Sequence, residues 1–157
     1  CKSLGARNIY CAGSGDRLEM AKKLGAIPID YKKENVPETV MKYTGGLGVK
    51  RIMETTGTVD GVKNACWSVA RGGSISVVGL PKGEVPVPVR HLVMDEIEFV
   101  GNRANPNTLD GAIAIAGPHM DELRSLITHV FPLSEYAKAY EIFTTRAAGA
   151  LKVILKP

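Results

Sequence analysis

The stretch with the clearest capacity for chemistry is a glycine turn, Ala12-Gly13-Ser14-Gly15-Asp16. Residues 7–11 before it are rich in β-formers and predict a buried strand, and Leu18, Ala21 and Leu24 after it recur at helical spacing. A helix that starts directly after a glycine turn favours an anion, because free backbone N–H groups and the positive end of the helix dipole face the ligand. The turn therefore predicts a place where part of a nucleotide binds.

Three further predicted strands, over residues 49–55, 74–80 and 97–101, also end in small or polar residues. In parallel α/β sheets, ligands bind beyond the carboxyl ends of the strands, where small residues leave the backbone accessible. The candidate cofactor-binding residues are Gly13, Ser14, Arg17, Thr56, Gly57, Val78, Gly79, Leu80, Gly101, Asn102 and Arg103.

No side chain stands out as catalytic, and no metal ligand is predicted. His91, His119 and His129 share no metal-ligand spacing with the cysteines, so we expect surface or hydrogen-bonded histidines. Glu54 could act as a general base, but no partner is visible in the sequence. We therefore expect Glu54 to make a structural hydrogen bond.

Composition narrows the class of protein. The 157 residues are 45% hydrophobic, which suits one globular domain, and the formal charge of +4 is too dispersed to predict a nucleic-acid partner. No apolar run approaches the length of a membrane span, no signal peptide opens the chain, and no membrane partner is expected. Three widely separated cysteines suit reduced thiols and a cytoplasmic location.

Strands and helices alternate along the chain. Asp16 with Glu19 predicts a capping-box start for the first helix, Asn35 a cap for the next, and Thr58 or Asp60 a cap for the third. Residues 81–89 are expected to form a proline-rich linker. Strands are expected over residues 7–11, 27–31, 49–55, 74–80, 97–101, 129–131 and 151–155, and later helices over 108–116, over 121–125 and from 134. This alternation predicts an α/β protein with a mainly parallel sheet.

Several segments together resemble the zinc-type medium-chain alcohol and polyol dehydrogenases, in the family's order and spacing. The segments are residues 4–7, 17–26, 44–49, 54–57, 72–80 and 127–133. The resemblance implies a doubly wound, Rossmann-like, mainly parallel sheet that lacks its first strand and phosphate loop. It divides the chain into a partial dinucleotide-binding domain, residues 1–148, and a strand returning to a catalytic domain absent from this chain, residues 149–157.

The resemblance also implies the coenzyme-binding portion of an NAD(P)-dependent enzyme. Such an enzyme oxidises a secondary alcohol or polyol by hydride transfer, with zinc as the Lewis acid that lowers the alcohol's pKa. The zinc belongs to the complete enzyme and is not bound by this chain, which alone is expected to be inactive. The partner is a small-molecule alcohol or polyol. In the family, the strand corresponding to residues 97–100 pairs with a second subunit, which implies a homodimer or homotetramer.

The choice of coenzyme depends on the residues after the first predicted strand. Family members that use NAD carry an acidic residue there, whereas this chain has Ala12-Gly13-Ser14. Without a carboxylate to repel a 2′-phosphate, and with Ser14 and Arg17 nearby, NADP is the expected coenzyme and NAD the alternative. A second interpretation takes Gly13-Ser14-Gly15 as the dinucleotide fingerprint and Asp30 as the ribose-binding acid. Leu18 then occupies the place of the third glycine.

Two other functions remain open from the sequence. One is a zinc-free quinone or enoyl reductase of the same family, which an upstream cysteine-rich zinc lobe would exclude. The other is a non-catalytic, truncated nucleotide-binding or assembly module, which the absent phosphate loop favours.

Overall fold

The computed structural model describes residues 1–103 and 107–157. The chain divides into two compact units, one formed by Cys1–Asp30 with Asn107–Pro157 and the other by Tyr31–Pro106. We describe each unit by itself. The prediction of separate domains over residues 1–148 and 149–157 stays a prediction.

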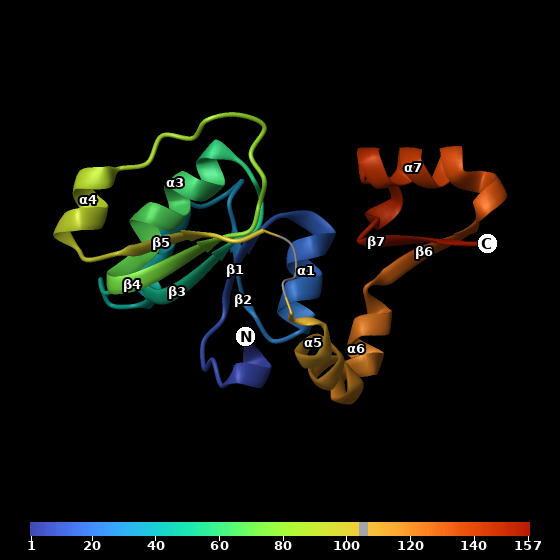
Figure 1. Cartoon of the computed structure of the whole chain (residues 1–157), viewed down its shortest axis with the longest axis horizontal. Coiled ribbons are helices and arrows are strands. Elements are labelled where there is room, and N and C mark those ends of the chain that lie inside the picture. The colour runs from blue at the N-terminus through green and yellow to red at the C-terminus, as the bar shows by residue number, and fades with distance from the viewer. Residues whose placement is uncertain (104–106) are drawn as a thin grey trace. The chain divides into compact units, whose positions relative to one another are not determined.

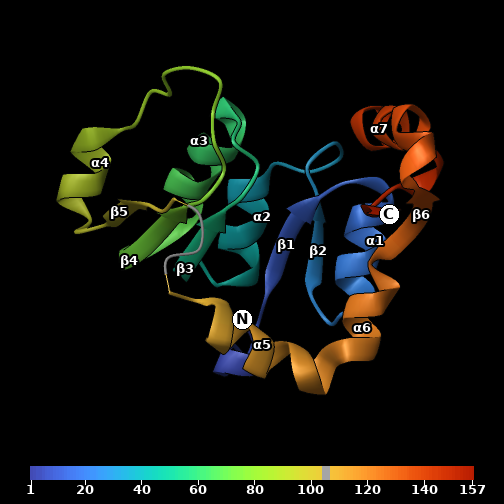
Figure 2. The ribbon, with the colours of Figure 1, turned by 45° about the vertical axis from the view of Figure 1, so that its right-hand side comes forward.

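The first unit contains two pairs of parallel strands with flanking helices. β1 (Tyr10–Gly13) pairs with β2 (Ile27–Asp30), and α1 (Gly15–Lys23) connects them, as Figure 2 shows. β6 (Ile127–Pro132) pairs with β7 (Lys152–Lys156). The remaining elements are the short 3-10 turns η1 (Lys2–Leu4), η2 (Gly117–His119), η3 (Leu133–Glu135) and η4 (Ala147–Gly149) and the helices α5 (Leu109–Ala116), α6 (Met120–Ser125) and α7 (Tyr136–Thr145).

The second unit is built on a three-stranded parallel sheet in the order β3-β4-β5. The strands are β3 (Val49–Glu54), β4 (Val69–Val77) and β5 (Glu98–Gly101), joined by α3 (Val59–Ser68) and α4 (Val89–Met94), and preceded by α2 (Val36–Tyr43). Figure 1 shows the three strands side by side. Every strand pairing in the described parts of the chain is parallel, which confirms the predicted α/β class.

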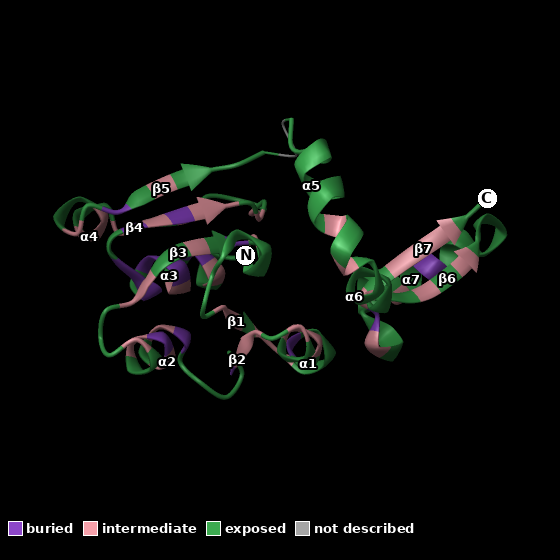
Figure 3. Cartoon of the chain, turned by 90° about the horizontal axis from the view of Figure 1, so that it is seen from below, coloured by how far each residue is buried: buried purple, intermediate pink, exposed green. Residues whose placement is uncertain are grey.

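The core of the second unit lies between α3 and β4, where Figure 3 shows buried residues concentrated. The helix turns one apolar face to the sheet because its buried residues recur at helical spacing, and β4 presents alternate residues to the same core. The buried cluster consists of Val62, Ala65, Cys66, Val69, Ile75 and Ile97.

Helix caps confirm part of the local prediction. Asn35 accepts a hydrogen bond from the Glu38 N–H at 3.1 Å, and Thr58 accepts one from the Gly61 N–H at 3.0 Å. The prediction for α1 is wrong, because Ser14, not Asp16, is the N-cap. Ser14 keeps extended backbone angles and Asp16 already lies in the first helical turn.

Three element boundaries also differ from expectation. β1 starts at Tyr10, later than predicted, and α4 occupies part of the segment between residues 81 and 97 that showed no clear helical pattern. β4 begins at Val69 and ends at Val77, so residues 78–80 leave the strand. The Val78 N–H still donates to the Glu54 carbonyl oxygen at 2.8 Å, but the Gly79 N–H turns to the same oxygen at 3.0 Å, and the ladder ends there.

Candidate functional site

The carboxyl ends of β3, β4 and β5 lie at one edge of the sheet. In the strand register, Glu54 is the partner of Val77, and Val77 is the partner of Gly101. All three strands run in the same direction, so the residues that follow them emerge at the same edge. The structure therefore brings together the eight predicted cofactor-binding residues of the second unit, namely Thr56, Gly57, Val78, Gly79, Leu80, Gly101, Asn102 and Arg103.

Two glycine turns at this edge interlock. A Cβ atom added to Gly79 would lie 2.7 Å from the Gly57 Cα and overlap the Gly57 N. Gly57 has φ +63, and a Cβ there would lie 2.8 Å from the Leu80 carbonyl oxygen. Both positions need glycine, because neither turn has room for a side chain. Beside the packed glycines the edge presents apolar surface, since Leu80 is 91% and Val78 43% exposed.

Glu54, the last residue of β3, lies beneath these turns and is 3% exposed. Its carboxylate accepts hydrogen bonds from the Thr56 N–H at 2.7 Å, from the Thr56 hydroxyl and from the Gly57 N–H at 3.3 Å. These contacts confirm the expectation that Glu54 makes structural hydrogen bonds. A burial of this kind requires such donors, because an unpaired buried carboxylate is strongly unfavourable.

The third strand end is held by Asn102. Its N–H donates to the Val77 carbonyl oxygen at 2.8 Å, and its side-chain amide donates to the Ser76 hydroxyl at 2.7 Å and to the Val100 carbonyl oxygen at 3.3 Å. The amide therefore ties the end of β5 to β4. Arg103 follows it and is exposed.

The other three predicted residues, Gly13, Ser14 and Arg17, lie together in the first unit. Gly13 ends β1 and Ser14 caps α1, while Arg17 is exposed in the first part of that helix. A Cβ at Gly13 would lie 3.5 Å from the Leu18 side chain, which is ordinary contact. Asp30 is the register partner of Gly13, which is the arrangement that the alternative fingerprint interpretation requires, although Leu18 is buried where that fingerprint has glycine.

One residue of the site was missed from the sequence. A Cβ at Gly61 would lie 2.6 Å from the Glu54 Oε1 and would overlap the Thr56 hydroxyl. Gly61 thus makes room for the buried carboxylate at the start of α3. A glycine three residues after an N-cap, in a helix that otherwise disfavours glycine, was the available signal.

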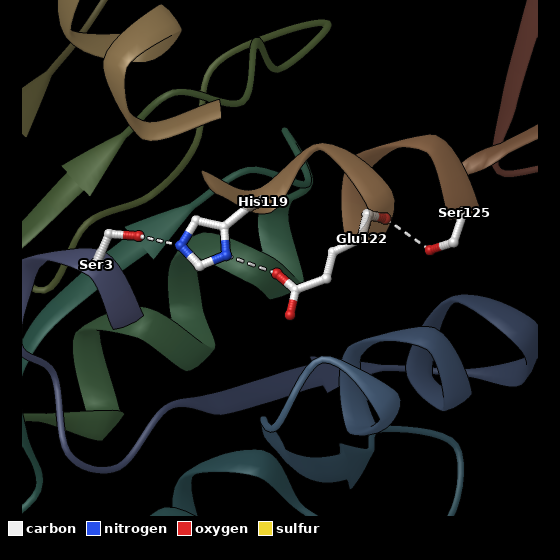
Figure 4. A network of polar contacts seen from close by, with 4 residues as sticks. All are labelled: Ser3, His119, Glu122 and Ser125. Carbon is white, nitrogen blue, oxygen red and sulfur yellow. Dashed lines mark hydrogen bonds and ion pairs between the residues drawn. The ribbon is translucent and has the colours of Figure 1, made fainter. Parts of the chain in front are cut away.

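The three histidines are hydrogen-bonded, as expected. Figure 4 shows His119 between two side chains, with its Nδ1 2.8 Å from the Glu122 Oε2 and its Nε2 3.3 Å from the Ser3 hydroxyl. Ser3 and Glu122 are both exposed, so this network links η1 to α6 at the surface of the first unit.

His91 is held on both sides of its ring. Its Nε2 lies 3.0 Å from the Cys66 carbonyl oxygen and its Nδ1 2.9 Å from the Asp95 Oδ2. The Trp67 indole stacks on the imidazole with the centroids 4.5 Å apart. The Nε2 contact and the stacked Trp67 attach α4 to α3, whereas the Nδ1 contact lies within the C-terminal end of α4.

The cysteines are free thiols. Burial raises the pKa of Cys11 and of Cys66, since desolvation penalises the thiolate. Across residues 1–103 and 107–157, no three side chains among His, Cys, Asp and Glu form a group that could hold a metal ion. None of the helices described is long and apolar enough to cross a membrane.

Parallel strands alternating with helices, with glycine turns at their carboxyl ends, define a Rossmann-like α/β protein. The sequence profile of the family described as zinc-binding dehydrogenase matches residues 1–116. The chain therefore belongs to the zinc-binding dehydrogenase family.

Individual relatives agree with this membership. The chain is 30% identical to L-threonine 3-dehydrogenase of Caldanaerobacter subterraneus subsp. tengcongensis, with 99% of this chain and 46% of the relative covered. It is 30% identical to human sorbitol dehydrogenase, with 99% and 44% covered. A crystal structure of an alcohol dehydrogenase from Thermotoga maritima superposes with a TM-score of 0.90 at 34% identity, covering 99% of this chain and 45% of that one. The chain thus spans less than half the length of these relatives.

Proposed function

We propose that this chain binds a nicotinamide adenine dinucleotide along the carboxyl ends of its parallel strands. In the complete protein it would serve a dehydrogenase that moves a hydride between a secondary alcohol or polyol and the coenzyme. The observation that carries the proposal is that the small-residue turns after β3 and β4, with Asn102 after β5, meet at one carboxyl edge of the sheet, the edge at which such sheets bind ligands. Membership of the zinc-binding dehydrogenase family supports it.

The residues at this edge fit a dinucleotide. Gly57 and Gly79 let the two turns pack against each other, and the exposed side chains of Val78 and Leu80 beside them offer apolar surface to a flat ring. A nicotinamide held at this edge would supply the hydride acceptor for oxidation of the alcohol. This chain's own contribution is to bind and orient the coenzyme.

We propose NADP as the preferred form, because Ser14 and Arg17 can receive a 2′-phosphate at the start of α1. Arg17 is exposed and places a guanidinium there, and no carboxylate follows β1 directly. The described residues do not fit zinc, since no three side chains among His, Cys, Asp and Glu lie together as ligands. We therefore derive no zinc-dependent step from it.

The test is a coenzyme titration of the complete protein that contains this sequence. NADP⁺ and NAD⁺ are titrated separately, followed by oxidation assays with secondary alcohols and polyols. Saturable binding of NADP⁺, tighter than that of NAD⁺, is expected. Absence of saturable binding by either dinucleotide at millimolar concentration would overturn the function, and tighter binding of NAD⁺ would overturn only the coenzyme preference.

We also propose that the protein forms a homodimer or homotetramer through β5. This strand pairs with β4 on one side, and over the described residues no strand pairs with its other edge. Glu98 is exposed while Phe99 packs against the core, so the strand keeps the predicted alternation. Open strand edges pair with other chains. Sedimentation of the complete protein is expected to show a dimer or larger species, and only monomer would defeat the proposal.

A further inference from the structure

Glu54 connects both glycine turns through two separate parts of one residue. Its side chain receives the N–H groups of Thr56 and Gly57, and its main-chain carbonyl oxygen receives those of Val78 and Gly79. The distances from these N–H donors to Glu54 oxygen atoms range from 2.7 to 3.3 Å. The end of β3 therefore holds the turn that follows it and also the turn that follows β4.

The carboxylate is also enclosed by positions that cannot carry a side chain. A Cβ at Gly61 would lie 2.6 Å from its Oε1, and a Cβ at Gly79 would lie 2.7 Å from its Oε2. The carboxylate is thus wedged between the first turn of α3 and the 78–79 turn. The carboxylate and the direct packing of Gly79 on Gly57 together fill the space between the two turns.

Among the residues that the structure describes, the donors that reach the Glu54 side chain come from Thr56 and Gly57, and Glu54 is 3% exposed. Such a carboxylate is too buried to touch a ligand at the sheet edge. Hydrogen bonds to a charged acceptor are stronger and more directional than neutral ones, so they hold the turn in one conformation. Glu54 can therefore act on a ligand only through the backbone that it holds.

We propose that Glu54 is a positioning residue for the dinucleotide, setting the spacing between the 56–57 and 78–79 turns that contact it. This inference rests on the proposed function, because it requires that the coenzyme bind at this edge. It gives the structural hydrogen bonds expected of Glu54 a consequence for coenzyme affinity. Glu54 takes no part in the chemistry of hydride transfer itself.

The test replaces the carboxylate by an amide of the same shape. In Glu54→Gln, one oxygen acceptor becomes an NH₂ donor that faces either the Thr56 donors or the Gly57 N–H. The matched control is Glu84→Gln, the same chemical change at an exposed position of the segment after Leu80. Both variants are made in the complete protein, and wild type is titrated first with NADP⁺ and NAD⁺.

Glu54→Gln is expected to raise the dissociation constant and the KM for the dinucleotide roughly tenfold, the size of effect when a charge-assisted hydrogen bond is lost. The KM for the alcohol is expected to stay unchanged, and Glu84→Gln is expected to match wild type. A role in stability alone would lower the amount of folded protein but leave the coenzyme KM of the folded molecules unchanged. Equal coenzyme affinity in Glu54→Gln and Glu84→Gln would overturn the inference, even with a lower melting temperature.

Two results need a separate interpretation, namely no dinucleotide binding by wild type and no folding of Glu54→Gln. If wild type binds no dinucleotide, the proposed function fails first, and the inference fails with it. If Glu54→Gln does not fold, Gly61→Ala displaces the carboxylate instead, because its methyl group would lie 2.6 Å from Oε1 while alanine favours the helix. Weaker dinucleotide binding by Gly61→Ala would support the inference, and unchanged binding would refute it.

Discussion

Replacing Gly79 by alanine should destabilise the second unit, because the new methyl group has no space. The methyl carbon would lie 2.7 Å from the Gly57 Cα and from the Glu54 Oε2, about 0.7 Å inside the 3.4 Å at which ordinary contact begins. Neither neighbour can retreat easily. Gly57 itself packs against Leu80, and its N–H is bonded to the Glu54 carboxylate.

The magnitude follows from these contacts. Forcing a methyl group into a filled site costs about 1–3 kcal/mol. Pulling the Gly57 N–H away from a buried carboxylate adds about 1–2 kcal/mol. A loss of about 3 kcal/mol in the free energy of unfolding is therefore expected, which is a large part of the total stability of an ordinary domain.

The assay is urea unfolding of the complete protein, with Gly83→Ala as the control. No atom lies within 4 Å of a Cβ at Gly83, and its φ is outside the left-handed region, so alanine there should be neutral or stabilise by up to about 1 kcal/mol. With a slope of about 2 kcal/mol per M, Gly79→Ala should lower the urea midpoint by about 1.5 M. Equal midpoints for the two variants would show that the turns are not interlocked as described.

Three other outcomes are expected. Arg17→Ala should weaken binding of NADP⁺ by about tenfold, the size of one exposed charge-assisted contact, and should leave binding of NAD⁺ unchanged. Titration calorimetry measures both affinities. An equal loss for the two coenzymes would contradict the proposed contact with the 2′-phosphate. Asn35→Ala should cost about 1 kcal/mol in thermal unfolding, because the Glu38 N–H loses its capping acceptor, and no loss would argue against this cap. Burial raises the pKa of Cys11 and Cys66 in the folded state, so the unfolded chain releases these two protons first as the pH rises. The free energy of unfolding should therefore fall as the pH rises above about 8.5. Urea unfolding at several pH values checks this, and replacing both cysteines by serine should remove that part of the fall.

Local chemistry explains what could be predicted from the sequence. Val62, Ala65 and Cys66 recur at helical spacing, and the structure buries all three. Asn35 and Thr58 cap their helices, because a side-chain oxygen placed before a helix satisfies a free N–H close by in the chain. These features depend on neighbours a few residues away, so the order of residues alone determines them.

The alternation of strands and helices likewise predicts the parallel α/β class. It can be seen in the sequence because the spacing of apolar residues shows which face each helix or strand buries. The edge at which the candidate contacts gather followed from the same reasoning, because parallel strands end together. The exact ends of the strands could not be predicted in this way. The end of β4 coincides with a shared hydrogen bond, in which the N–H groups of Val78 and Gly79 both donate to the carbonyl oxygen of Glu54, more than twenty positions earlier.

The sequence by itself thus determined the class of fold, the caps of α2 and α3, the apolar faces and the small residues at the strand ends, but not the cap of α1. Tertiary structure alone decided that Gly57 and Gly79 interlock and that Gly61 makes room for the carboxylate of Glu54. The physical reason is that these constraints join backbone atoms of segments distant in sequence. Steric exclusion and burial act only between atoms that the folded chain has brought together.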